Sequence, residues 1–226
     1  MLHLARRLWK NRLPSRTLVY LEEHILGEKR TEDDVPGWMI PAMYLDYIRS
    51  GDGRELQGVF YHNAMDILSM AALTNQAAHM LADPLNGNVE HGEDLASLGM
   101  LFEDMGQIDK ASQTMKQALD LELPTELYQR TLMRLARLHK RKENHDDAIS
   151  LWWQAAADRQ IYAHEELAKF YEHREHNFNE AIQWCNSAIA ILKSSDVPRH
   201  EQVFWEPEFE HRLARLIGKL ARKSSD

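Results

Sequence analysis

The sequence has few of the residues that break helices and almost none that form cross-links. It contains 10 glycines, 7 prolines and 1 cysteine in 226 residues. Because a β-sandwich or barrel needs many tight turns, this scarcity of glycine and proline favours an all-α fold. The single cysteine, Cys185, cannot form an internal disulfide, and its apolar helical neighbours predict a buried thiol.

Long apolar runs are also absent. No segment approaches the ~20 apolar residues that cross a bilayer, and the first residues become charged too soon for a signal peptide. We therefore expect a cytoplasmic protein with no membrane partner. The net charge of −8 argues against a surface devoted to nucleic acid. One local exception, a basic cluster before Glu22, could contact phosphates, although a solvated helix face is the commoner explanation. It comprises Arg6, Arg7, Lys10, Arg12 and Arg16.

Turn-forming residues at 83–91 divide the chain into two regions. We expect a first domain at 1–82, a linker at 83–91 and a second domain at 92–222. Helical apolar spacing in the first region predicts helices at 2–10, 15–27, 40–50 and 58–81. The second region is helical almost throughout, with turns predicted near Gly106, Pro124, Asn144 and Asn177.

One series of small and medium residues recurs three times in the second region. Gly99, Ala111, Met115 and Ala118 are separated by 12, 4 and 3 residues. The same spacings return in Ala136, Ala148, Trp152 and Ala155, and, with 13 in place of 12, in Ala168, Ala181, Cys185 and Ala188. Small residues at such positions allow the two helices of a hairpin to approach closely. At the turns, Gly106, Asn144 and Asn177 tolerate left-handed backbone conformations.

This pattern resembles the tetratricopeptide repeat family over residues 92–190. The repeats would span about 92–124, 125–160 and 161–193, and a helix at 207–222 would cap the stack. The alternative is a plain helical bundle. The resemblance implies a concave surface that binds a protein or peptide.

The candidate for chemistry lies in the first region, in the segment Tyr61-His62-Asn63-Ala64-Met65-Asp66-Ile67-Leu68-Ser69. His62 and Asp66 are four residues apart and share a helix face, with Ser69 one turn further on. We expect Tyr61, Met65 and Leu68 to anchor the helix in a core. A carboxylate that holds a divalent ion beside an imidazole that accepts a proton suits metal-assisted hydrolysis. By itself the pair is more often a surface ion pair or a cap.

The neighbouring segments favour the interpretation of His62 and Asp66 as a functional site. The segments Leu4-Ala5-Arg6-Arg7-Leu8-Trp9, Pro36-Gly37-Trp38-Met39-Ile40-Pro41 and Tyr44-Leu45-Asp46-Tyr47 precede the His62–Asp66 segment. Over roughly residues 2–82 the chain resembles the C-terminal part of the YprB-type ribonuclease H-like proteins of bacteria, relatives of the DnaQ-like 3′–5′ exonucleases. The resemblance implies a nuclease in which four acidic residues hold two Mg²⁺ or Mn²⁺ ions. Asp66 would be the last of these metal ligands and His62 the neighbouring general base.

The sequence departs from this family in the spacing of His62, four residues before Asp66 where the usual spacing is five, and, more importantly, in an absence. The first metal motif of the family, Asp-x-Glu on an early strand, is not found before His62, and one carboxylate cannot hold two ions. We therefore expect a fragment that binds no metal ion alone and is inactive alone. The alternative is a non-catalytic interaction module built on the repeats. A helical part without its sheet should expose apolar side chains, with Leu8, Trp9, Leu18, Leu21 and Leu26 as candidates.

Two weaker candidates remain. His173, Glu175 and His176 resemble metal ligands, but their spacing predicts a solvated turn. The tryptophans of the second region could stack on bases, yet at repeat positions they should belong mostly to the core. They are Trp152, Trp153, Trp184 and Trp205.

Overall fold

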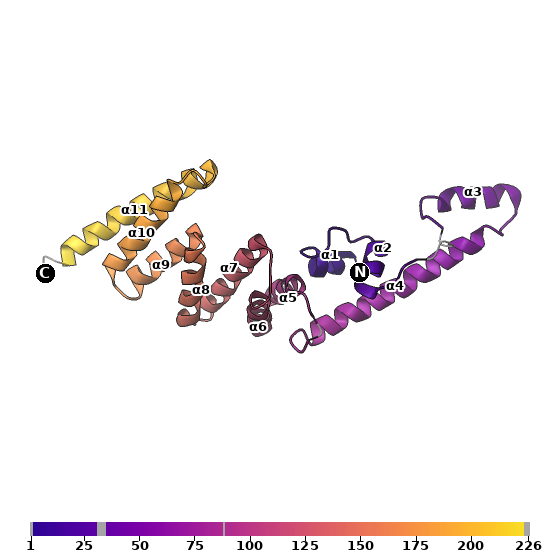
Figure 1. Ribbon diagram of the computed structural model, residues 1–226, viewed down its shortest axis with the longest axis horizontal. Helices are drawn as coiled ribbons and strands as arrows, with labels where there is room; N and C mark the ends of the chain where they lie inside the picture. Colours follow the sequence, from indigo (N-terminus) through magenta and orange to yellow (C-terminus); the bar gives the residue numbers. More distant parts are fainter. Residues whose placement is uncertain (1, 31–34, 88, 224–226) are drawn as a thin grey trace. The chain divides into compact units, whose positions relative to one another are not determined.

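The computed structural model describes residues 2–30, 35–87 and 89–223. Every regular element within these ranges is a helix, which confirms the all-α prediction (Figure 1). The chain divides into two compact units, residues 1–127 and 128–226. Residues 31–34 of the predicted first domain and Asn88 of the predicted linker lie outside the described ranges. The predicted domain limits stay predictions.

The first unit contains a docked N-terminal helix, a long helix and one helical hairpin. Helix α1 (Leu2–Trp9) packs against α5 (Gly92–Asp104), and α5 pairs with α6 (Ile108–Leu119). The remaining elements are α2 (Leu18–Leu21), its continuation as the π-helix η1 (Glu22–Leu26), α3 (Ile40–Ser50) and α4 (Leu56–Ala82). Helices α2, α3 and η1 all pack against α4. The four helices predicted in this region are confirmed to within a few residues.

Helix α1 is not exposed as predicted. Leu8 and Trp9 are fully buried, and Leu21 is 3% exposed. Leu8 and Trp9 are buried because α1 lies on α5, where polar contacts hold the segment that follows α1; Leu21 lies on α2, which packs against α4. Arg12 pairs with Asp94 at 2.8 Å, and the Asn11 side chain donates to Ser97 Oγ at 2.8 Å. The first repeat hairpin therefore supplies the apolar partner that the prediction had assigned to a sheet.

The exposed apolar side chains lie instead around α3 and α4. No residue of α3 is buried. Along α4, Tyr61 and Leu68 were expected in a core, but they are 41% and 62% exposed, so that prediction is wrong. The elements that pack against α4 are short and cover only part of its 27 residues. We call the most exposed side chains here the α3–α4 apolar set: Trp38, Tyr44, Leu45, Ile48, Phe60, Ile67 and Leu68.

The close helix approach predicted from the repeat spacing is present in the α5–α6 hairpin. A Cβ added at Gly99 would lie 2.6 Å from Met115 Cγ, which is closer than such atoms pack. Ala111, Met115 and Ala118 are fully buried along the same seam. The hairpin turn contains Gly106 at φ +75°, a left-handed conformation that favours glycine.

The second unit continues this pattern with two more hairpins and a long last helix. Its elements are α7 (Thr125–Arg141), which begins shortly before the division, α8 (His145–Ala157), α9 (Ile161–His173), α10 (Phe178–Leu192) and α11 (Arg199–Lys223). Helix α9 packs against α8, α10 and α11. The repeat positions Ala168, Ala181, Cys185 and Ala188 are all fully buried in one core cluster, as the spacing predicted.

The turns predicted near Asn144 and Asn177 are present, but neither asparagine adopts the left-handed conformation that it tolerates. That conformation belongs to the preceding residues, Glu143 at φ 59° and His176 at φ 51°. Asn144 and Asn177 have negative φ and occupy the N-cap positions of α8 and α10. The side chain of Asn177 accepts a hydrogen bond from the Glu180 N–H at 3.2 Å. An N-cap needs negative φ, so the turn is made one residue earlier.

The last helix is longer than predicted. We expected it at 207–222, from the helical spacing of its apolar residues. Helix α11 begins at Arg199 instead and includes Pro207 in its interior. Its Phe209 and Leu216 are buried against α10, which provides packing that outweighs the lost backbone hydrogen bond.

Candidate functional site

The predicted pair lies together on one face of α4. His62 Nε2 is 3.5 Å from Asp66 Oδ2, as a four-residue helical spacing allows. The Asp66 side chain is 32% exposed and that of His62 is 14% exposed, so the carboxylate is the more accessible of the two. Ser69, one turn further along, is buried. The catalytic and metal-binding roles of His62 and Asp66 stay predictions.

A cation that we did not predict joins this pair. The guanidinium of Arg30 donates to Asp66 Oδ1 at 2.5 Å and lies 3.3 Å from His62 Nδ1. The same group binds Glu22 through two hydrogen bonds, at 2.6 and 2.8 Å. Glu22 is only 3% exposed. Arg30 therefore connects a buried carboxylate on η1 with the partly exposed carboxylate on α4.

The electrostatics of the four-residue cluster follow from these distances. A buried carboxylate without a counter-charge is costly, and the planar fork of Arg30 offsets that cost at Glu22. Asp66 shares the same cation, so one of its oxygens is engaged by Arg30 and the other lies near His62. The cluster as described is thus an internally paired set of two acids, one arginine and one histidine.

Gly37 lies close to the imidazole of His62. A Cβ added at Gly37 would lie 3.9 Å from His62 Nε2. The Pro36–Gly37 turn that contributed to the family resemblance therefore passes next to the imidazole.

Glu22 and Arg30 could be predicted only weakly from the sequence. Glu22 follows Leu21 on a face that is otherwise apolar, which marks it as an acid in need of a partner. Its partner lies 8 residues later, and Asp66 lies 36 residues beyond Arg30. A pairing across a turn and between two helices leaves no periodic signal.

The basic cluster at the N-terminus is partly used within the unit. Arg7 pairs with Asp104, and Arg12 pairs with the buried Asp94. Arg16 donates to the carbonyl oxygen of Leu13 at 3.0 Å. The Arg12 side chain is only 17% exposed, so neither a phosphate contact nor a solvated helix face describes it. Arg7 and Arg12 instead attach the N-terminal segment to α5, whereas Arg16 binds within its own segment.

The other candidates form no site. No group of three or more histidine, cysteine, aspartate or glutamate side chains that could hold a metal ion occurs in the described parts of the chain. Trp152 is buried as expected for a repeat position, whereas Trp153 is 47% exposed and packs edge-on against Trp184.

Comparisons with known proteins agree with this architecture. A family model of the RNase H superfamily matches residues 1–78, and a tetratricopeptide repeat model matches residues 95–123. The uncharacterized protein YprB of Bacillus subtilis (strain 168) is 28% identical over 225 residues, which is 98% of this chain and 52% of that protein. The chain thus spans about half the length of this curated relative. No solved structure matches the chain significantly.

The matched segments coincide with the elements described above. The RNase H superfamily match includes His62, Asp66, Glu22 and Arg30, and the repeat match covers most of α5 and α6. Among the described helices, none has the length and apolarity needed to cross a membrane. The resemblance that we drew from the sequence is confirmed: the chain is similar to a YprB-type protein, with a ribonuclease H-like segment followed by tetratricopeptide-like repeats.

Proposed function

We propose that Asp66 and His62 are this chain's contribution to the active site of a metal-dependent, exonuclease-like protein that processes nucleic acid in the cytoplasm. One observation carries the proposal: a carboxylate and an imidazole lie 3.5 Å apart on one helix face within the segment that matches the RNase H superfamily. Asp66 would be a metal ligand, and His62 would hold the proton taken from an attacking water.

The described residues do not by themselves fit two divalent ions. A two-metal site needs several oxygen ligands, and no group of three candidate ligands occurs in residues 2–30, 35–87 and 89–223. Asp66 is moreover engaged by Arg30, a cation that a metal ion would have to displace or accompany. We therefore propose that the chain on its own does not hydrolyse nucleic acid.

A nuclease assay tests both parts of this proposal. The chain is incubated with Mg²⁺ or Mn²⁺ and 5′-labelled single-stranded DNA or RNA, and we expect no shortened product. Activity that disappears in Asp66→Asn would contradict the proposed inactivity. The proposed role of Asp66 as a metal ligand is tested in a longer protein. If the reading frame upstream of Met1 encodes an Asp-x-Glu motif, that longer protein is produced and assayed in the same way. There Asp66→Asn should abolish metal-dependent degradation, whereas the exposed Asp46→Asn should not.

A second candidate function rests on the repeats. The tetratricopeptide match and the successive hairpins α5–α6, α7–α8 and α9–α10 support a protein or peptide interaction module. This role does not require a nuclease site. It is tested by capture of a peptide under conditions in which no nuclease activity is seen.

A further inference from the structure

The second unit contains an open pocket of about 360 Å³ that neither the nuclease proposal nor the repeat match assigns. It lies among α7, α8, α9 and α11, with Trp152 and Phe170 contributing apolar surface. Its charged lining comprises Lys140, Glu166, Lys169, Arg174, Arg212 and Arg215. Five of these six side chains are basic.

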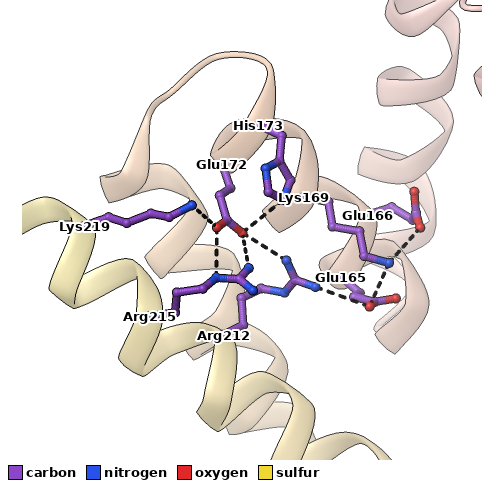
Figure 2. A network of polar contacts seen from close by, with 8 residues as sticks. All are labelled: Glu165, Glu166, Lys169, Glu172, His173, Arg212, Arg215 and Lys219. Carbon is purple, nitrogen blue, oxygen red and sulfur yellow. Dashed lines mark hydrogen bonds and ion pairs between the residues drawn. The ribbon is translucent and has the colours of Figure 1, made fainter.

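The acids around the pocket are outnumbered by the bases that bind them (Figure 2). Helix α9 presents Glu165, Glu166 and Glu172 along one side, and α11 presents Arg212, Arg215 and Lys219 at helical spacing. Glu172 is contacted by all three of these α11 cations, at 2.7–3.0 Å. Lys169 lies 2.8 Å from Glu165 and 3.4 Å from Glu166.

Lys140 of α7 adds a further cation, 2.5 Å from Glu166. The three glutamates are thus shared among five bases: Lys140, Lys169, Arg212, Arg215 and Lys219. Arg174 also lines the pocket and increases the surplus. The region keeps a net positive charge within a chain whose net charge is −8.

Exposure determines which sign an incoming ligand meets. The side chains of Lys140, Lys169 and Arg215 are 48%, 35% and 40% exposed. The glutamate side chains are less accessible, at 21%, 18% and 0% for Glu165, Glu166 and Glu172. The less exposed glutamates therefore position the more exposed lysine and arginine side chains. These basic side chains have further N–H groups that can donate to a ligand.

The aromatic lining distinguishes between two kinds of anionic ligand. Single-stranded nucleic acid binds by stacking its bases on exposed aromatic faces. Trp152 is only 3% exposed, and the Lys140 ammonium lies 5.8 Å from the centre of its ring. The tryptophan therefore offers no free face to a base, and Phe170, the other aromatic side chain of the lining, is partly buried and packs edge-on against Tyr171. Carboxylates need no such face, because lysine and arginine bind them directly.

We propose that this pocket binds an acidic peptide segment of a partner protein. The peptide's carboxylates would contact Lys140, Lys169 and Arg215, and an adjacent apolar side chain would lie against Phe170. The inference rests on the proposed interaction role of the repeats and names its ligand class. It does not depend on the proposed nuclease role.

The experiment uses the full chain and a fluorescent peptide of alternating Glu and Leu, with an alternating Gln and Leu peptide as its control. We expect the Glu peptide to bind more tightly, with an affinity that falls as NaCl rises. Lys140→Gln combined with Lys169→Gln should weaken binding by about tenfold or more. Lys193→Gln, an exposed change away from the pocket, should leave the affinity unchanged.

A gain-of-affinity variant guards against misfolding as the cause of a loss. Glu166→Gln removes the acid that engages Lys140 and Lys169, so it should tighten binding of the Glu peptide. Equal binding of the Glu and Gln peptides would overturn acid selectivity while leaving an interaction role standing. If neither peptide bound, both the acid selectivity of the pocket and its role in binding peptides would be overturned. Tighter binding of a labelled single-stranded oligonucleotide, lost in the double lysine variant, would overturn the peptide assignment.

Discussion

Arg30 and Asp66 lie 36 residues apart in the chain and are joined by a hydrogen bond of 2.5 Å, which makes the proposed metal ligand one end of an internal ion-pair cluster. The other end is the buried Glu22. Because Arg30 is the cation between the two carboxylates, we expect its removal to lower the free energy of unfolding of the first unit.

We expect Arg30→Met to destabilise the first unit by about 3–5 kcal/mol, since it would leave Glu22 as a buried charge without this partner. Urea unfolding followed by circular dichroism measures the change. Glu22→Gln together with Arg30→Met should recover part of the loss. Arg49→Met, at a side chain 76% exposed, should change the free energy of unfolding little. A similar loss from both single variants would contradict the proposed importance of the cluster.

The second unit should lose stability in acid through Glu172. Burial alone would raise the pKa of Glu172, but hydrogen bonds from Lys219 and Arg215 outweigh it and lower the pKa to about 2 from its ordinary value of 4.5. A lowered carboxyl pKa stabilises the folded state above the unfolded pKa. That contribution, about 3 kcal/mol, is lost as the pH falls from 4.5 toward 2.

Glu172→Gln tests this pH dependence directly. At pH ~7 the variant should be less stable by about 3–5 kcal/mol, because three basic groups would surround a neutral amide. At the acid end of the range, where Glu172 itself is protonated, the difference should shrink. Unfolding curves across pH measure both. Glu208→Gln, at an exposed position on α11, serves as the control. An equal effect of that change would show that Glu172 is not the source of the pH dependence.

Helix approach in the first hairpin can be tested with one methyl group. Gly99→Ala should destabilise the α5–α6 hairpin by about 1–3 kcal/mol, because the new Cβ would overlap Met115. The control is Gly218→Ala in α11, where a Cβ meets nothing within 4 Å. That change should stabilise its helix by about 0.5–1 kcal/mol. Thermal melts of the two variants should therefore shift in opposite directions, and a shift in the same direction would contradict the packing described.

Hydrogen exchange should separate elements within the first unit. The amides of α3, which has no buried residue, should exchange faster than those of α5. Helix α1 should instead be protected together with α5, because its Leu8 and Trp9 are buried. Mass spectrometry of peptic fragments measures the difference. Fast exchange throughout α1 would show that it does not stay docked.

Local patterns in the sequence predicted most of the helices. Gly99, Ala111 and Ala118 mark a seam where only small residues fit, and their spacing is visible without a structure. The spacing of His62 and Asp66 likewise places them on one helix face. Such predictions succeed because helical periodicity determines which residues share a face.

The errors concern contacts between segments that are distant in sequence. Leu8 and Trp9 are buried because α1 packs on α5, roughly ninety residues later, and periodicity cannot name that partner. Arg30 was missed for the same reason. The left-handed residues Glu143 and His176 were missed because capping asparagines follow them and occupy a different backbone region.

The α3–α4 apolar set has a practical consequence for the solubility of the chain. Side chains such as Trp38, at 81% exposed, and Phe60, at 70% exposed, are in contact with water. Sulfate and phosphate are excluded from protein surfaces and strengthen the association of apolar groups. The chain should therefore salt out at low ammonium sulfate concentrations, and Trp38→Ser with Phe60→Ser should raise the concentration at which it precipitates.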